Sequence, residues 1–179
     1  LGAILQGTPD ISTLGVDAPA TAHGFGAGIA VGMARELQAI GSPGRVVCLL
    51  NVKQLSEELV WHAFQSACGY RLGRIMYVVI INNSDEKVLS ESLSLLMQET
   101  AELGLNPVYL DGHSFSSLED FFSGINWEDC RPKMIILHTR IGKGLPFIES
   151  NSNQYKRMLT MSEADLALSI LEVKTADEG

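Results

Sequence analysis

The run of residues 75–81, Ile-Met-Tyr-Val-Val-Ile-Ile, restricts the fold of this chain more than any other feature. It carries no charged side chain and has the length of a strand, so it predicts a strand buried on both faces in a parallel sheet. Shorter apolar runs precede and follow it, and segments with helical spacing of apolar residues separate them. Strands are predicted over residues 45–50, 75–81, 107–110 and 134–138, and helices over residues 24–40, 56–70, 91–103, 117–122 and 162–173.

This alternation predicts an α/β fold, with an open, mostly parallel sheet and helices on both of its faces. The length of 179 residues suits a single domain, which we expect over residues 1–173, with a frayed polar tail at residues 174–179. Residues 142–153 are predicted to form a loop, and Ser116 is predicted to cap the helix at 117–122. Ligands of such sheets lie beyond the carboxyl ends of the strands, so we expect the functional site there.

Charge and cysteine content exclude several classes of function. With 13 Lys and Arg against 21 Asp and Glu, the net charge is −8, which excludes the basic surface of a nucleic-acid-binding protein. No run of about 18 apolar residues occurs, so no membrane span is predicted. Cys48, Cys68 and Cys130 are an odd number and are interpreted as buried free thiols, and no secretory signal opens the chain. These features predict a cytoplasmic protein.

Four stretches of the chain carry motifs that occur together in one family. They are LGAILQGTP at residues 1–9, HGFGAGIAVGMA at 23–34, a helix with Val60-Trp61 at 55–70, and YLDGH at 109–113 followed by HTRIGKGLPF at 138–147. Each motif alone is weak, because short glycine-rich segments arise by chance. In this order, over nearly the whole chain, they resemble the transketolase family, in the amino-terminal, diphosphate-binding half that also occurs as a separate subunit.

The resemblance implies a thiamine-diphosphate-binding fold. In that family this half holds the diphosphate through a divalent metal, while a second half, from the same or another chain, holds the aminopyrimidine and supplies the activating glutamate. The reaction moves a two-carbon ketol unit between sugar phosphates. We therefore expect a homo- or hetero-oligomer with a pyrimidine-binding transketolase half, built through the helices that carry residues 23–34 and Trp61. Because the sequence begins at Leu1 rather than at a methionine, we expect it to be part of a longer chain or a heteromer.

The metal-binding motif of the family is not intact in this chain. The family has GDG at the end of one strand and an asparagine further along. Here Asn51-Val52-Lys53 ends the strand, so Val52 takes the place of the aspartate, while Asn82, 82 − 52 = 30 positions later, keeps the second ligand position with Asn83 beside it. Magnesium takes oxygen ligands, and a valine side chain has none. The sequence therefore predicts no Mg²⁺ site and leaves the binding of thiamine diphosphate open.

Two histidines of the family site are also missing. Thr8 stands where the family has the histidine of GHP, and Tyr155 falls where it has the histidine of a WHG-like element. The histidine of DGH, His113, is interpreted as a residue that shapes its loop. The glycines on either side of Lys143 allow either a phosphate contact or a plain turn. No catalytic residue is therefore assigned.

The residues predicted to contact a cofactor are Gly24, Gly26, Lys53, Asn82 and Asn83. A lysine at the end of a strand can act as the counter-charge of a diphosphate in place of a metal. The N–H groups near Gly24 and Gly26 can bind an anion at the start of a helix. Alternatively, Lys53 is a solvated side chain in a turn that has lost its ligand, which is the interpretation we favour.

Three functions are left open by the sequence. The first is a transketolase-like subunit with a degenerate metal and diphosphate site, acting as a non-catalytic structural or regulatory partner of a catalytic subunit. The second is an active two-carbon ketol or acyl transferase component that binds thiamine diphosphate through a Lys53-assisted site together with a partner subunit. The third is an α/β module that binds another phosphate ligand. We favour the first, because Val52, Thr8 and Tyr155 alter one site while the scaffold motifs persist.

Overall fold

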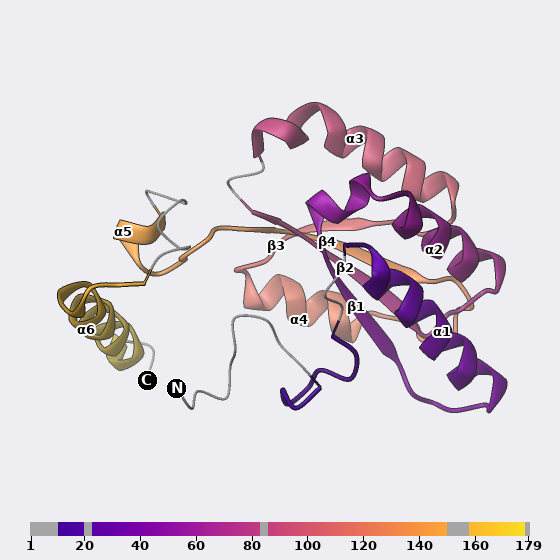
Figure 1. The fold of residues 1–179 in the computed structure, drawn as a ribbon, viewed down its shortest axis with the longest axis horizontal. Helices are drawn as coiled ribbons and strands as arrows, with labels where there is room; N and C mark the ends of the chain where they lie inside the picture. The colour runs from indigo at the N-terminus through magenta and orange to yellow at the C-terminus, as the bar shows by residue number, and fades with distance from the viewer. Residues whose placement is uncertain (1–10, 20–22, 83–85, 150–157, 178–179) are drawn as a thin grey trace.

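A computed structural model describes residues 11–19, 23–82, 86–149 and 158–177 of the chain (Figure 1). Its centre is a sheet of four parallel strands in the order β1-β2-β4-β3. The strands are β1 (Val46–Asn51), β2 (Ile75–Asn82), β3 (Val108–Asp111) and β4 (Lys133–Thr139). Each strand begins and ends within one residue of its predicted position, and the predicted α/β fold is confirmed.

Helices flank and connect the strands and correct several of the predictions; α3, for example, begins at Glu86 and not at residue 91. They are α1 (Phe25–Ala39), the 3₁₀ turn η1 (Val52–Ser56), α2 (Glu58–Gly69), α3 (Glu86–Glu102), α4 (Phe115–Ser123), α5 (Pro146–Glu149) and α6 (Met161–Asp177). The predicted loop at 142–153 contains α5, which is too short to show helical periodicity. Ser114, not Ser116, caps α4, because it has extended backbone angles and its hydroxyl accepts from the Ser117 N–H. No Pro or Gly interrupts α6 before Asp177, so the helix includes most of the predicted frayed tail.

The helices lie on both faces of the sheet, as predicted (Figure 1). Helices α1, α2 and α3 cover the face on which the odd-numbered residues of β2 pack into the larger hydrophobic cluster. Helix α4 covers the other face, where Phe121 packs against Met76 and Val78. Because both faces of β2 are covered, its residues 75–79 are all buried, which explains the continuous apolar run.

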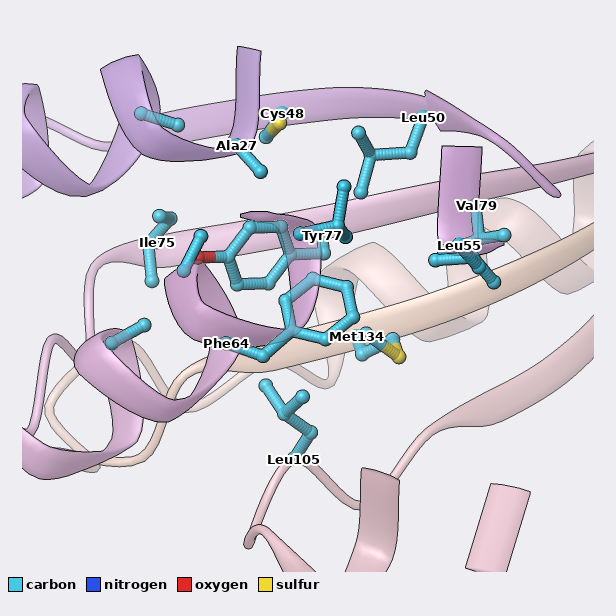
Figure 2. Packing of buried hydrophobic residues seen from close by; sticks show 14 of the residues in the cluster. Ala27, Cys48, Leu50, Leu55, Phe64, Ile75, Tyr77, Val79, Leu105 and Met134 are labelled. Atoms are coloured by element: carbon cyan, nitrogen blue, oxygen red, sulfur yellow. The ribbon is translucent and has the colours of Figure 1, made fainter. Parts of the chain in front are cut away.

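Aromatic rings occupy the centre of the larger cluster (Figure 2). The ring of Phe64, on α2, meets the ring of Tyr77, on β2, edge to face, with 4.6 Å between the centroids. On its other side Phe64 lies 5.7 Å from the ring of Trp61. The Tyr77 hydroxyl has no hydrogen-bond partner among the described residues, and burial raises its pKa. These rings hold α2 on the sheet mainly through apolar contact.

The structure shows how deeply each cysteine is buried and how apolar the helices are. All three cysteines are free, but only Cys48, on β1, is buried, and burial raises the pKa of its thiol to about 11. Cys68 and Cys130 are half-buried, because they lie near the amino-terminal edge of the sheet, outside the densest packing. In the described part of the chain, no helix combines the length and the hydropathy that a membrane span requires.

Candidate functional site

The carboxyl ends of the strands bring the predicted site residues to one edge of the sheet. Strands β1 and β2 lie side by side with Asn51 opposite Ile80, and β2 and β4 lie side by side with Asn82 opposite Thr139. The turn η1, which contains Lys53, follows directly after β1. The predicted residues Val52, Lys53 and Asn82 are therefore placed on adjacent strand ends. Asn83, Thr8 and Tyr155 lie outside the described residues.

The start of α1 lies beside this turn. A side chain at Gly24 would bring its Cβ within 3.2 Å of the Glu57 Cβ and 3.3 Å of Val60, at the beginning of α2. Gly24 also has a φ of 79°, the left-handed region that glycine adopts without strain. Close packing between α1 and α2 thus explains Gly24 without a ligand. Gly26 is partly buried in the first turn of α1, which no side chain caps.

The turn η1 is closed by hydrogen bonds within itself. The side-chain oxygen of Asn51 accepts from the Lys53 N–H at 3.0 Å, and the Asn51 N–H donates to Oε1 of Gln54 at 2.8 Å. The Ser56 hydroxyl donates to the Lys53 carbonyl at 2.8 Å. The indole N–H of Trp61 donates to the Leu55 carbonyl, also at 2.8 Å. These four oxygens are therefore occupied by the chain's own donors.

Val52 and Lys53 take different positions within this turn. Val52 is half-buried and packs against the larger hydrophobic cluster. Lys53 is exposed to solvent. Val52 therefore contributes apolar packing rather than an oxygen ligand.

Asn82 is held by the neighbouring strand. Its Oδ1 accepts a hydrogen bond of 2.7 Å from the hydroxyl of Thr139, which also lies 3.2 Å from the Ile81 carbonyl. Threonine at this position on β4 thus orients the amide of Asn82. No local pattern predicts this contact, because the two residues are 57 positions apart.

The residues present do not fit a magnesium-bridged diphosphate. Such a site needs several oxygen ligands around the cation. Val52 supplies none, and Asn51 and Gln54 bind within the turn. Among the described residues, no group of three or more His, Cys, Asp or Glu side chains is arranged to hold a metal ion. Asn82 offers one neutral side-chain oxygen, which accepts a hydrogen bond from Thr139.

The second glycine-rich segment at this edge, 142–144, forms a tight turn. The Leu145 N–H donates to the Gly142 carbonyl at 2.9 Å, and the Gly144 N–H donates to the Glu149 carboxylate at 2.6 Å. Gly142 has a φ of 74°, and a Cβ there would lie 2.6 Å from the Cβ of Ile148. The turn therefore accounts for both glycines, and the Gly144 N–H is already bound to a carboxylate.

Replacing Gly142 by alanine is expected to lower the free energy of unfolding by about 2–4 kcal/mol, because the methyl group meets Ile148 and the backbone is left-handed. Urea denaturation followed by circular dichroism measures this. Gly41 is a matched control, since its φ is 66° but nothing lies within 4 Å of its Cβ position. Gly41→Ala should cost only the backbone strain, about 1 kcal/mol. Equal losses in the two variants would show that the contact with Ile148 is unimportant.

His113 shapes the loop after β3, as the sequence predicted. Its Nε2 accepts from the Arg140 N–H at 2.8 Å. The backbone N–H of His113 donates to Oδ1 of Asp111 at 2.9 Å. The loop is thereby attached to the end of β4, where the Tyr109 and His138 rings are stacked 6.5 Å apart.

Two residues of this edge could have been found from sequence spacing. Asn51 and Gln54 are three positions apart, which is the spacing of a capping box, and both hydrogen bonds of that box are present. Reading that pattern would have predicted a turn that satisfies its own polar groups.

Comparison with known proteins gives relatives of one kind. The chain is 29% identical over 177 residues to "Transketolase-like protein 2" of Bos taurus, covering 96% of the chain and 28% of that protein. It is 22% identical over 172 residues to an apulose-4-phosphate transketolase subunit from Phocaeicola vulgatus, covering 93% of the chain and 60% of that protein. The structure of a transketolase from Leishmania mexicana superposes with a TM-score of 0.58 at 18% identity, over 74% of this chain and 22% of that one.

The chain covers different fractions of the lengths of these relatives. The chain spans just over a quarter of the length of the transketolase-like protein and three-fifths of the bacterial subunit. No protein-family model matches the chain. The likeness to the solved transketolase shows a shared fold.

Proposed function

We propose that this chain, a member of the transketolase family, is a non-catalytic structural or regulatory subunit that partners a chain carrying the pyrimidine-binding half. One observation carries the proposal. At the strand end where the family resemblance expects a metal-binding carboxylate, Val52 packs on the core and the surrounding turn binds its own polar groups. Residues 1–173 would form the single domain of this subunit.

The proposal of a partner is supported by the relatives and by exposed apolar side chains. One relative is named as a subunit, and the chain covers three-fifths of it. On the helices predicted to form the interface, Phe25 is 56% exposed, and Ile29 and Leu59 are each 40% exposed. Exposed apolar side chains on α1 and α2 are suited to burial against a second polypeptide.

Isothermal titration calorimetry tests the proposal. The purified chain, alone and with a chain that carries the pyrimidine-binding half, is titrated with thiamine diphosphate in the presence of Mg²⁺ or of EDTA. We expect no metal-dependent binding by this chain at micromolar concentration, because the described turn offers no carboxylate to the cation. A catalytic transketolase, titrated with the same cofactor solutions, serves as the positive control for binding.

Two results would contradict the proposal in different ways. Micromolar, metal-dependent binding by the isolated chain would show that an intact metal site forms. Binding that persists in EDTA and disappears in Lys53→Ala would instead support the lysine-assisted transferase. Lys143→Gln, which removes another exposed lysine at the same edge, is a suitable charge control for that variant.

A further inference from the structure

Charged side chains and two thiols gather at the amino-terminal edge of the sheet, opposite the candidate site. Cys68, near the end of α2, and Cys130, just before β4, line the same pocket of about 310 Å³. Arg71 and Arg131 line it as well, in a chain whose net charge is −8. Asp129 lines it too, and its carboxylate accepts from Nη2 of Arg131 at 2.7 Å. The pocket therefore combines two thiols with two arginines and one carboxylate.

Arg71 binds the sulfur of Cys130 through two nitrogen atoms. Its Nη2 lies 2.8 Å and its Nε 3.2 Å from Sγ, so the guanidinium group faces the sulfur with both donors. Hydrogen bonds from a cation stabilise the thiolate over the thiol. Arg71 also has a φ of 56°, which is unusual for a residue other than glycine. Of the two thiols, Cys130 is the one whose sulfur is held by the Arg71 guanidinium.

Cys68 comes shortly before Arg71 in the sequence. The Arg71 N–H donates to the Cys68 carbonyl at 3.0 Å, so the residue that binds Cys130 starts from the same helix end as Cys68. The loop that carries Cys130 is packed against Gly73, whose Cβ position lies 2.8 Å from the Cys130 Cα. Both cysteines are half-buried and open to the shared pocket.

Cys48 is more deeply buried than the other two cysteines, although burial raises the pKa of the Cys68 thiol as well. Cys48 lies on β1 inside the larger hydrophobic cluster and is 6% exposed. Burial raises the pKa of its thiol to about 11, so it is protonated at neutral pH. It therefore serves as an internal control for thiol chemistry in the folded protein.

We propose that Cys130 and Cys68 are a redox-active pair that closes to a disulfide on reaction with a hydroperoxide. The Cys130 thiolate attacks one oxygen of hydrogen peroxide, the O–O bond breaks, and hydroxide leaves, which oxidises the sulfur to a sulfenic acid. The Cys68 thiol then gives up its proton and attacks the Cys130 sulfur, and the departing hydroxide takes a proton to form water. Overall the two thiols lose two electrons and two protons, and the peroxide is reduced to water.

Mass spectrometry of the full chain tests this pair. The reduced protein is treated with hydrogen peroxide at pH 7.5, and the remaining thiols are alkylated after denaturation. We expect a linked Cys68–Cys130 peptide, with Cys48 recovered in its alkylated form, and reversal by dithiothreitol. In Cys68→Ser the reaction should stop at a sulfenic acid on Cys130 that dimedone traps.

The role of Arg71 is tested by the rate of the same reaction. Arg71→Met should react about tenfold more slowly at Cys130, because the thiolate loses its paired cation. Arg35→Met is the matched control, since Arg35 contacts Gln38 and the Tyr70 ring but not a sulfur. Continued protection of Cys48 shows that each variant is folded. An unlinked Cys68, or equal rates in the two arginine variants, would overturn the proposal.

Discussion

Alanine at position 64 should lower the free energy of unfolding by about 3–5 kcal/mol, the range measured when a buried phenylalanine is truncated. Phe64 is fully buried and lies between the rings of Trp61 and Tyr77. Its removal leaves a cavity under α2 and also takes away two edge-to-face ring contacts. The larger hydrophobic cluster cannot close this space, because Tyr77 is anchored on the central strand of the sheet.

Chemical denaturation of the variant and the parent protein measures this loss, with the slope of the transition compared as a check on two-state unfolding. Phe115→Ala is the matched control. Phe115 is 86% exposed at the start of α4, so its truncation should change stability by no more than about 0.5 kcal/mol. Similar losses for the two variants would contradict the packing described for α2.

Gly73→Ala should destabilise the protein by about 3 kcal/mol, at the upper end of the usual cost of overpacking. A methyl group at this position would overlap the carbonyl of Asp129 and lie 2.8 Å from the Cys130 Cα. Both obstacles are backbone atoms, which cannot turn aside as a side chain can. Lys133 makes them less able to move, since its Nζ binds the carbonyls of Gly73 and Asp129 at 2.6 and 2.7 Å.

Gly69→Ala provides the contrast for this variant. Gly69 is the last residue of α2, and nothing lies within 4 Å of its Cβ position. Alanine is the better helix former, so this change should be neutral or should stabilise by up to about 1 kcal/mol. The two variants are compared by thermal and urea unfolding. A stable Gly73→Ala protein would show that the loop at 129–130 does not pack on residue 73 as described.

The predicted strands agreed with the structure because their signal is local. Residues 75–81 are apolar without interruption, and β2 is covered by α1, α2 and α3 on one face and by α4 on the other. The helices with a clear apolar face, such as the one around Phe64, were likewise predicted. The turn η1 and helix α5 were missed, because elements of 5 and 4 residues are too short to show a period.

The candidate site was predicted only in part. Asn51 and Val52 were correctly assigned to the end of a strand, and Asn82 to the end of the next. The hydrogen bond from Thr139 to Asn82 was not predicted, and neither was the packing of Val52 on the core. The assignment of Gly24, Gly26, Lys53, Asn82 and Asn83 as cofactor contacts stays a prediction.

The sequence alone determined which segments are strands and that one of them ends in an aliphatic residue instead of a carboxylate, because both are properties of neighbouring residues. Only the tertiary structure decided what each polar group at the strand ends binds and which thiols share a pocket. Thr139 reaches Asn82 and Arg71 reaches Cys130 across 57 and 59 positions of the chain. Contacts over such separations follow from how strands and loops pack, and no local pattern of residues encodes them.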